Sequence, residues 1–128
     1  MNRRTFAFAL AALAAVPGAF AQSNGLDGRK FHGVFLEKGK TSGDADKLVF
    51  KNGRFRSLAC DRYGYSDAPY RATAEGDSIR FEAETESPRY GKLVWRGVVH
   101  GDRLDATATM IRAGRPPKEN WVVAAART

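Results

Sequence analysis

The chain has 128 residues, with 21 basic and 14 acidic residues and a formal net charge of +7. The two signs are interspersed and form no Lys/Arg cluster of the kind that tracks phosphates, which argues against nucleic-acid binding. A single cysteine excludes an intramolecular disulfide, and the length predicts one domain.

The first 21 residues predict a secretion signal. Two arginines at positions 3 and 4 precede an apolar run over 6–16, which is too short to span a bilayer. The small-x-small pattern at 19–21 predicts cleavage before Gln22. The paired arginines leave two export routes open, the general secretory route and the twin-arginine route.

Removal of residues 1–21, which hold two arginines and no acidic residue, leaves 107 residues with a net charge of +5. This mature chain, residues 22–128, is expected to form a single domain without a transmembrane segment. The signal predicts a periplasmic or secreted location.

The mature chain alternates short runs of apolar and polar residues with turn residues, which indicates strands rather than helices. The expected strands are 31–36, 47–50, 54–59, 70–75, 78–86, 92–100, 103–112 and 120–125. No amphipathic helix longer than one turn is expected. Strands that follow one another without a long crossover predict an all-β fold, a single antiparallel eight-stranded up-and-down barrel, because closure removes exposed sheet edges.

Three two-residue turns, Asn52-Gly53, Gly76-Asp77 and Gly101-Asp102, set one consistent register. In that register Trp95 lies opposite Ala108 and beside Gly97, so small residues leave room for the indole on the inner face. The bulky side chains expected inside are Phe50, Phe55, Tyr70, Ile79, Phe81, Leu93, Trp95, Leu104, Met110 and Trp121. Such an interior predicts a filled barrel, or a small cavity near one mouth, rather than a deep pocket.

The layout resembles the calycin-like barrels, the lipocalin- and avidin-type group, over the whole mature chain. Those families often begin their first strand with Gly-x-Trp, whereas Gly28-Arg29-Lys30-Phe31 differs in spacing and in its aromatic residue. No ligand-binding residue is therefore carried over. The run CDRYGY at 60–65, together with the Gly-Asp turns, is also similar to small exported bacterial proteins. These resemblances imply a barrel and an exported location, and no established activity.

The segment 60–70 holds three of the four tyrosines and is the candidate ligand-binding region. A tyrosine offers a rigid apolar body with one hydrogen-bonding end, which suits a binding mouth. The candidate residues are Cys60, Asp61, Arg62, Tyr63, Tyr65 and Tyr70. The other interpretation, which is the favoured one for this loop, is a plug, in which the tyrosines cover one barrel end and their hydroxyls bond the backbone, because a loop that caps a barrel needs such residues.

Cys60 has several interpretations in an oxidising compartment: an intermolecular disulfide, a redox-sensitive thiol, a soft ligand, or a small buried hydrophobe. Burial is the favoured one, since free cysteine is among the most buried residue types. The two histidines, His32 and His100, match no zinc-ligand spacing with Cys60. The sequence predicts no metal and no cofactor.

An enzymatic function has weak support, because Glu82, Glu84 and Glu86 share a solvent face with Arg80 and no catalytic triad is evident. The leading hypothesis is a non-enzymatic barrel that binds a small or apolar ligand at its mouth.

The alternative hypothesis is a protein-interaction module, an inhibitor or an envelope-assembly factor, that uses its loops or its outer face. On that face Val94, Val98 and Ile111 are expected to form an apolar patch. A cavity of roughly 300 Å³ or more would favour the ligand, and a filled interior with an exposed apolar strip would favour the partner.

Overall fold

The computed structural model describes residues 25–127, so the predicted signal at 1–21 lies outside the described residues. The strands are β1 (Lys30–Glu37), β2 (Asp44–Lys51), β3 (Arg54–Ser57), β4 (Ala68–Glu75), β5 (Ser78–Ser87), β6 (Gly91–His100), β7 (Arg103–Ile111) and β8 (Lys118–Arg127). A 3₁₀ helix, η2 (Leu58–Tyr63), follows β3. Within residues 25–127, no helix has both the length and the apolar character needed to cross a membrane.

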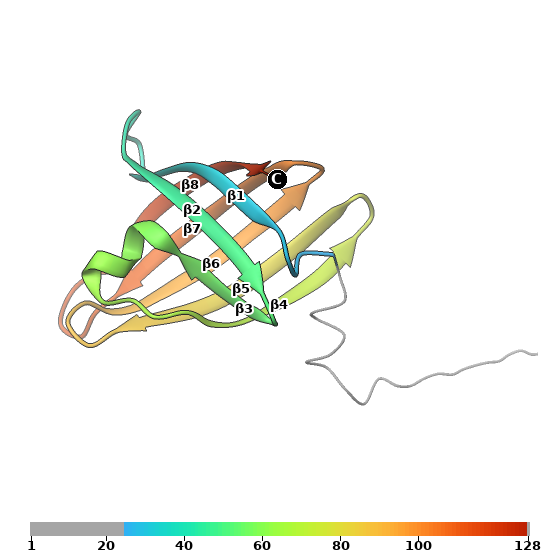
Figure 1. The fold of residues 1–128 in the computed structure, drawn as a ribbon. Coiled ribbons are helices and arrows are strands. Elements are labelled where there is room, and N and C mark those ends of the chain that lie inside the picture. The colour runs from blue at the N-terminus through green and yellow to red at the C-terminus, as the bar shows by residue number, and fades with distance from the viewer. Residues whose placement is uncertain (1–24, 128) are drawn as a thin grey trace, which may run out of the picture.

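The eight strands form one closed antiparallel barrel, as predicted (Figure 1). Each strand pairs with the next along the chain, and β1 also pairs with β8, where Val34 lies opposite Val123. Closure leaves neither the first nor the last strand with an unpaired edge, which is the physical reason for expecting a barrel.

The three predicted hairpin registers are confirmed. Phe50 pairs with Phe55 across the first turn, Ala72 with Phe81 across the second, and Trp95 with Ala108 across the third. Asn52, Gly53, Gly76 and Gly101 all have positive φ, the backbone conformation that tight hairpin turns of this kind require.

Aromatic rings fill the middle of the barrel. The Phe50 ring centroid lies 5.0–5.9 Å from those of four others, Phe31, Phe55, Tyr70 and Phe81. Trp95 is fully buried, 4.8 Å from Phe55, and its Nε1 donates to Thr85 Oγ1 at 3.3 Å.

Gly97 makes room for a different ring from the one expected. It lies opposite Phe81, and an added Cβ would come within 2.5 Å of that ring rather than of the indole.

The prediction that Trp121 points inward is wrong. Its side chain is 37% exposed, because the inward positions of β8 fall on Asn120, Val122 and Ala124. An apolar strip does lie on the outer face, but it consists of Val34, Trp121 and Val123 on β1 and β8. In the patch expected from the sequence, Val94 and Val98 are half-buried and Ile111 is exposed.

The expected strand 54–59 ends early, at Ser57, and is followed by the 3₁₀ helix Leu58–Tyr63, which was not predicted. At the C-terminal end of η2, Gly64 adopts a left-handed conformation, with φ of 87°, and its N–H donates to the Asp61 carbonyl. This helix buries only Cys60, so the core remains that of the barrel.

The residues just before β1 close one end of the barrel, a role that the sequence did not reveal. Leu26 is fully buried there. The Asp27 carboxylate accepts hydrogen bonds from the backbone N–H groups of Asn52 and Gly53 and from the Tyr70 hydroxyl. These bonds fasten the segment to the turn between β2 and β3.

Candidate functional site

A half-open cavity of about 420 Å³ occupies the opposite end of the barrel. The η2 helix lies at this end, together with the β5–β6 and β7–β8 turns (Figure 1). Its lining is formed by Phe35, Leu36, Glu37, Lys40, Ser42, Gly43, Asp44, Ala59, Cys60, Tyr63, Tyr65, Tyr90, Leu93, Met110, Lys118 and Asn120. The wall is therefore mainly apolar and aromatic, with charged side chains from the loops and strand ends. We refer to this space as the mouth cavity.

Asp46 anchors the start of η2. Its carboxylate is almost fully buried and accepts hydrogen bonds from Ser57 Oγ at 2.7 Å and from the backbone N–H of Ala59 at 2.9 Å. Burial raises the pKa of Asp46, and these hydrogen bonds oppose that rise. The carboxylate thus fixes the backbone that presents Cys60 to the mouth cavity.

Ser87 positions the two tyrosines at the entrance. Its hydroxyl donates to the Tyr63 carbonyl at 2.7 Å and accepts from the backbone N–H of Tyr90 at 3.2 Å. The rings of Tyr63 and Tyr90 then meet edge to face at 5.7 Å. The guanidinium groups of Arg89 and Arg112 both lie over the Tyr90 ring.

Cys60 lies in the cavity wall and is buried. Burial raises the pKa of its thiol to about 11, so the sulfur is protonated at neutral pH. A protonated thiol is a weak nucleophile and a poor metal ligand. This environment agrees with the interpretation of Cys60 as a small buried hydrophobe.

Tyr65 also lies in the wall and is 6% exposed. Its hydroxyl is the one buried side-chain nitrogen or oxygen among residues 25–127 that has no hydrogen-bond partner. The plug alternative expects tyrosine hydroxyls that bond the backbone, and Tyr65 makes no such bond.

The other candidates lie away from the cavity wall. Asp61 pairs with Arg56 at 2.6 Å and Arg62 with Asp44 at 3.2 Å, both on the exposed side of η2. Tyr70 lies toward the closed end, where its hydroxyl donates to Asp27. The structure therefore brings together Cys60, Tyr63 and Tyr65 in the cavity wall. Asp61, Arg62 and Tyr70 do not line it, although the Arg62 guanidinium lies over the Tyr63 ring, 5.2 Å from its centroid.

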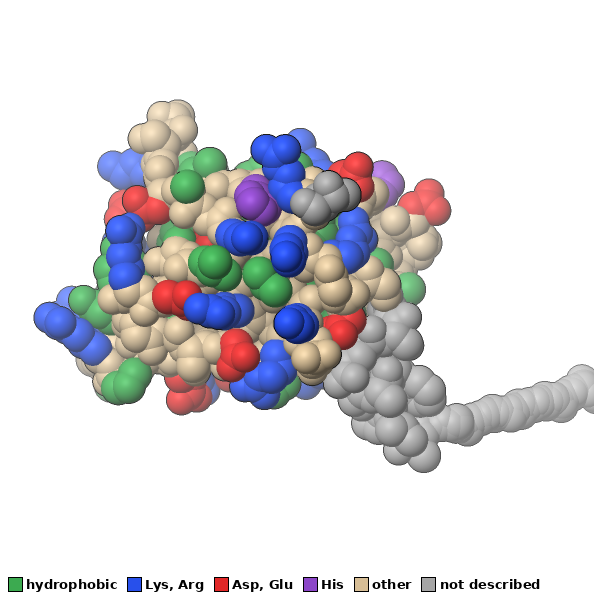
Figure 2. All heavy atoms as spheres, in the orientation of Figure 1, with side chains coloured by type: hydrophobic (Ala, Val, Ile, Leu, Met, Phe, Trp, Pro, Cys, Tyr) green, Lys and Arg blue, Asp and Glu red, His purple; other side chains and the backbone are tan. Residues whose placement is uncertain are grey.

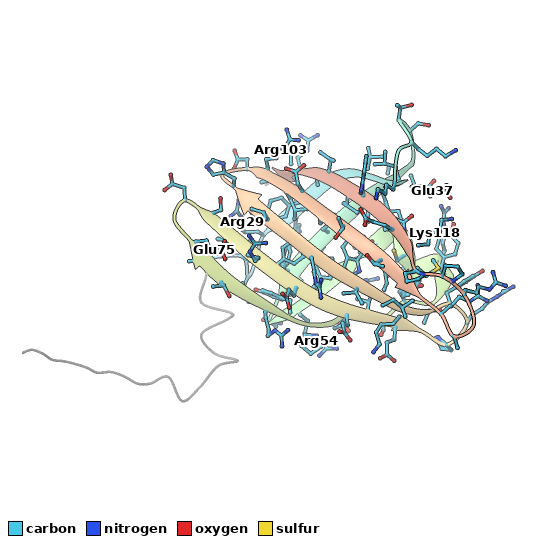
Figure 3. All side chains as sticks on the ribbon, turned by 180° about the vertical axis from the view of Figure 1, so that it is seen from behind. Arg29, Glu37, Arg54, Glu75, Arg103 and Lys118 are labelled. Carbon is cyan, nitrogen blue, oxygen red and sulfur yellow. The ribbon has the colours of Figure 1, made fainter. Side chains whose placement is uncertain are left out.

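An exposed ion pair marks the rim of the mouth cavity. Lys118 Nζ lies 2.8 Å from Glu37 Oε2, and Figure 3 places both residues at the end of the barrel away from Glu75 and Arg103. Lys118 lowers the pKa of Glu37 by donating this hydrogen bond. With Arg62 and Asp44 also paired, two cations of the rim region already have carboxylate partners.

Sequence reasoning missed several wall residues that come from distant segments, among them Phe35, Tyr90 and Asn120. The hairpin register did predict that Leu93 and Met110, two of the wall residues, lie on the inner face. That they line a cavity follows only from the shape of the closed barrel.

The charged side chains elsewhere show no large field of one sign on the face drawn in Figure 2, where acidic groups lie among the basic ones. Within residues 25–127, no three His, Cys, Asp or Glu side chains gather where they could hold a metal ion.

A comparison of the chain with protein-family models, with curated proteins and with solved structures found no match.

Proposed function

We propose that this protein is a non-enzymatic binding protein, exported to the periplasm or out of the cell, whose mouth cavity holds a small, largely apolar ligand. The observation that carries the proposal is the cavity itself. Its volume of about 420 Å³ lies within the range of small-molecule sites, roughly 300–1,000 Å³. The likeness to ligand-carrying calycin barrels in strand number and connectivity agrees with it.

The division of the barrel into two parts supports this assignment. Aromatic packing around Phe50 and Trp95 fills the middle, and Leu26 closes one end. Space for a ligand therefore lies at the mouth, in front of Leu93 and Met110. A ligand there would bury apolar surface against the side chains of Phe35, Leu93 and Met110.

The non-enzymatic part of the proposal is supported by the chemistry of the wall. Its most nucleophilic group is the Cys60 thiol, and burial keeps that thiol protonated. The carboxylate of Glu37 is ion-paired at the solvent-exposed rim rather than buried with a raised pKa, the condition that would suit a general acid.

Titration with N-phenyl-1-naphthylamine, a neutral probe that fluoresces in apolar surroundings, tests this function. Wild-type protein should give saturable binding. Met110→Trp should weaken it at least roughly tenfold, because a larger side chain would fill the cavity. The matched control is Ile111→Trp, which introduces the same tryptophan at the next residue of β7, where the side chain is exposed on the outer face. Equal binding to both variants, or no saturable binding to the wild type, would contradict the proposal.

A further inference from the structure

The Tyr65 hydroxyl is a buried hydrogen-bond donor without a partner among residues 25–127. Buried polar groups in folded proteins are nearly always paired, because an unpaired group loses its hydrogen bonds to water and gains none in return. Binding sites are a recurring exception, since there the ligand completes the pairing.

Tyr65, which carries this hydroxyl, is one of the residues that line the mouth cavity. The ionisable groups of Cys60 and Tyr90, both in that wall, are close enough to raise the pKa of Tyr65, although burial contributes the most to the rise. The hydroxyl is therefore protonated at neutral pH and available to donate. Tyr65 itself is held by the backbone bond from its N–H to the Cys60 carbonyl.

Resting on the proposed function, we propose that the ligand of the mouth cavity is an apolar molecule with a neutral carbonyl oxygen, which accepts the hydrogen bond of Tyr65. The complement of a protonated phenol is an acceptor oxygen. A ketone, ester or amide supplies that oxygen without bringing a charge into the cavity.

A carboxylate fits this position less well than a neutral carbonyl. A buried carboxylate needs several donors or a desolvated cation, and the hydroxyl of Tyr65 is a single donor. The negative charge of Asp46 is close enough to Cys60 to raise the pKa of that thiol, and the same charge would repel a carboxylate ligand beside Cys60. The charge of Arg112 does reach Tyr65, but its guanidinium is only partly buried and lies over the Tyr90 ring.

Two ligands of the same shape and three proteins test the inference. 2-Decanone carries the carbonyl, and 2-methyl-1-decene replaces its oxygen by a methylene group. The affinity of each is measured by its displacement of N-phenyl-1-naphthylamine from the cavity. The proteins are the wild type, Tyr65→Phe, and the matched control Tyr70→Phe, which loses a hydroxyl at the other end of the barrel.

The expected result is that Tyr65→Phe weakens 2-decanone roughly tenfold and leaves 2-methyl-1-decene unchanged or tighter. Tyr70→Phe should change neither affinity. Comparing the effect of one substitution on two ligands removes their difference in general hydrophobicity. Probe binding by Tyr65→Phe also reports that the variant is folded.

An equal effect of Tyr65→Phe on both ligands would overturn the inference and leave the proposed function standing, because the probe would still bind at the mouth. Decanoate provides the third arm. If decanoate binds more tightly than 2-decanone and loses more affinity in Tyr65→Phe, the ligand is anionic and the neutral carbonyl is wrong. Failure of the probe to bind the wild type would instead refute the proposed function.

Discussion

The same chemical change at two tyrosines should alter the stability of the ligand-free protein in opposite directions. Tyr65→Phe removes a buried hydroxyl that has no partner, whereas Tyr70→Phe removes one that donates to the Asp27 carboxylate at 3.1 Å. Both side chains are at least nine-tenths buried, so the substitutions remove comparable groups from comparable surroundings.

The magnitudes follow from hydrogen-bond energetics. Removing an unpaired buried polar group recovers its desolvation penalty, so Tyr65→Phe should raise the free energy of unfolding by about 1–2 kcal/mol. Tyr70→Phe should lower it by about 1–2 kcal/mol, since its bond has a charged acceptor. Asp27 would keep the backbone donors of Asn52 and Gly53, which limits the loss.

Urea denaturation of the ligand-free variants measures both effects. With a denaturant slope of about 1–3 kcal/mol per molar, the two midpoints should move apart from that of the wild type by roughly 0.5–1 M each. A Tyr65→Phe variant less stable than the wild type by 1 kcal/mol or more would refute the reasoning, because its hydroxyl would then have a partner. A stabilised Tyr70→Phe would refute the bond to Asp27.

Three further predictions concern the core, the thiol and the buried carboxylate. Trp95→Ala should cost about 3–5 kcal/mol of unfolding free energy in urea, because the indole is fully buried at the barrel centre; a loss under about 1 kcal/mol would contradict that placement. Cys60 should react with Ellman's reagent far more slowly in native than in urea-unfolded protein, and rapid native labelling would contradict its burial. Burial holds the pKa of Asp46 above its usual 3.8 in the folded protein, so the folded state binds more protons than the unfolded state between 3.8 and the raised value. The stability of the wild type should therefore fall as pH rises through that window. Asp46→Asn should lack this fall when urea midpoints are measured between about pH 4 and about pH 7, and identical pH profiles of the two proteins would exclude a contribution from Asp46.

Local signals in the sequence were enough to predict the hairpins. A two-residue turn with positive φ sets which residues face one another, and the volumes of the facing residues agree across each turn. Phe50 opposite Phe55 and Trp95 opposite Ala108 were read in this way and lie as expected. Trp121 was misplaced because no tight turn precedes it, so one residue of uncertainty in the start of β8 reversed its face.

The candidate site was predicted in part, for a related reason. Cys60, Tyr63 and Tyr65 are close in sequence, so the short segment that carries them could be recognised from its composition. Tyr70 belongs to the same run, yet the pairing of β4 with β3 places it beside Gly53 in the turn between β2 and β3, where its hydroxyl meets Asp27. Proximity in the sequence therefore predicted the cluster of Cys60, Tyr63 and Tyr65 correctly, but it wrongly included Tyr70 on β4.

By itself the sequence determined the strand order and the hairpin registers, because each depends on contacts between neighbours along the chain. It also indicated closure into a barrel, because pairing the first strand with the last removes the exposed sheet edges. Only the tertiary structure decided where the barrel is filled and where it is hollow. That outcome depends on how rings from separate strands pack together and on Leu26 closing one end. At the other end it depends on Phe35, Leu93 and Asn120 lining the same cavity as residues of η2. The unpaired hydroxyl of Tyr65 belongs to the same category, since whether a buried donor has a partner depends on every segment folded around it.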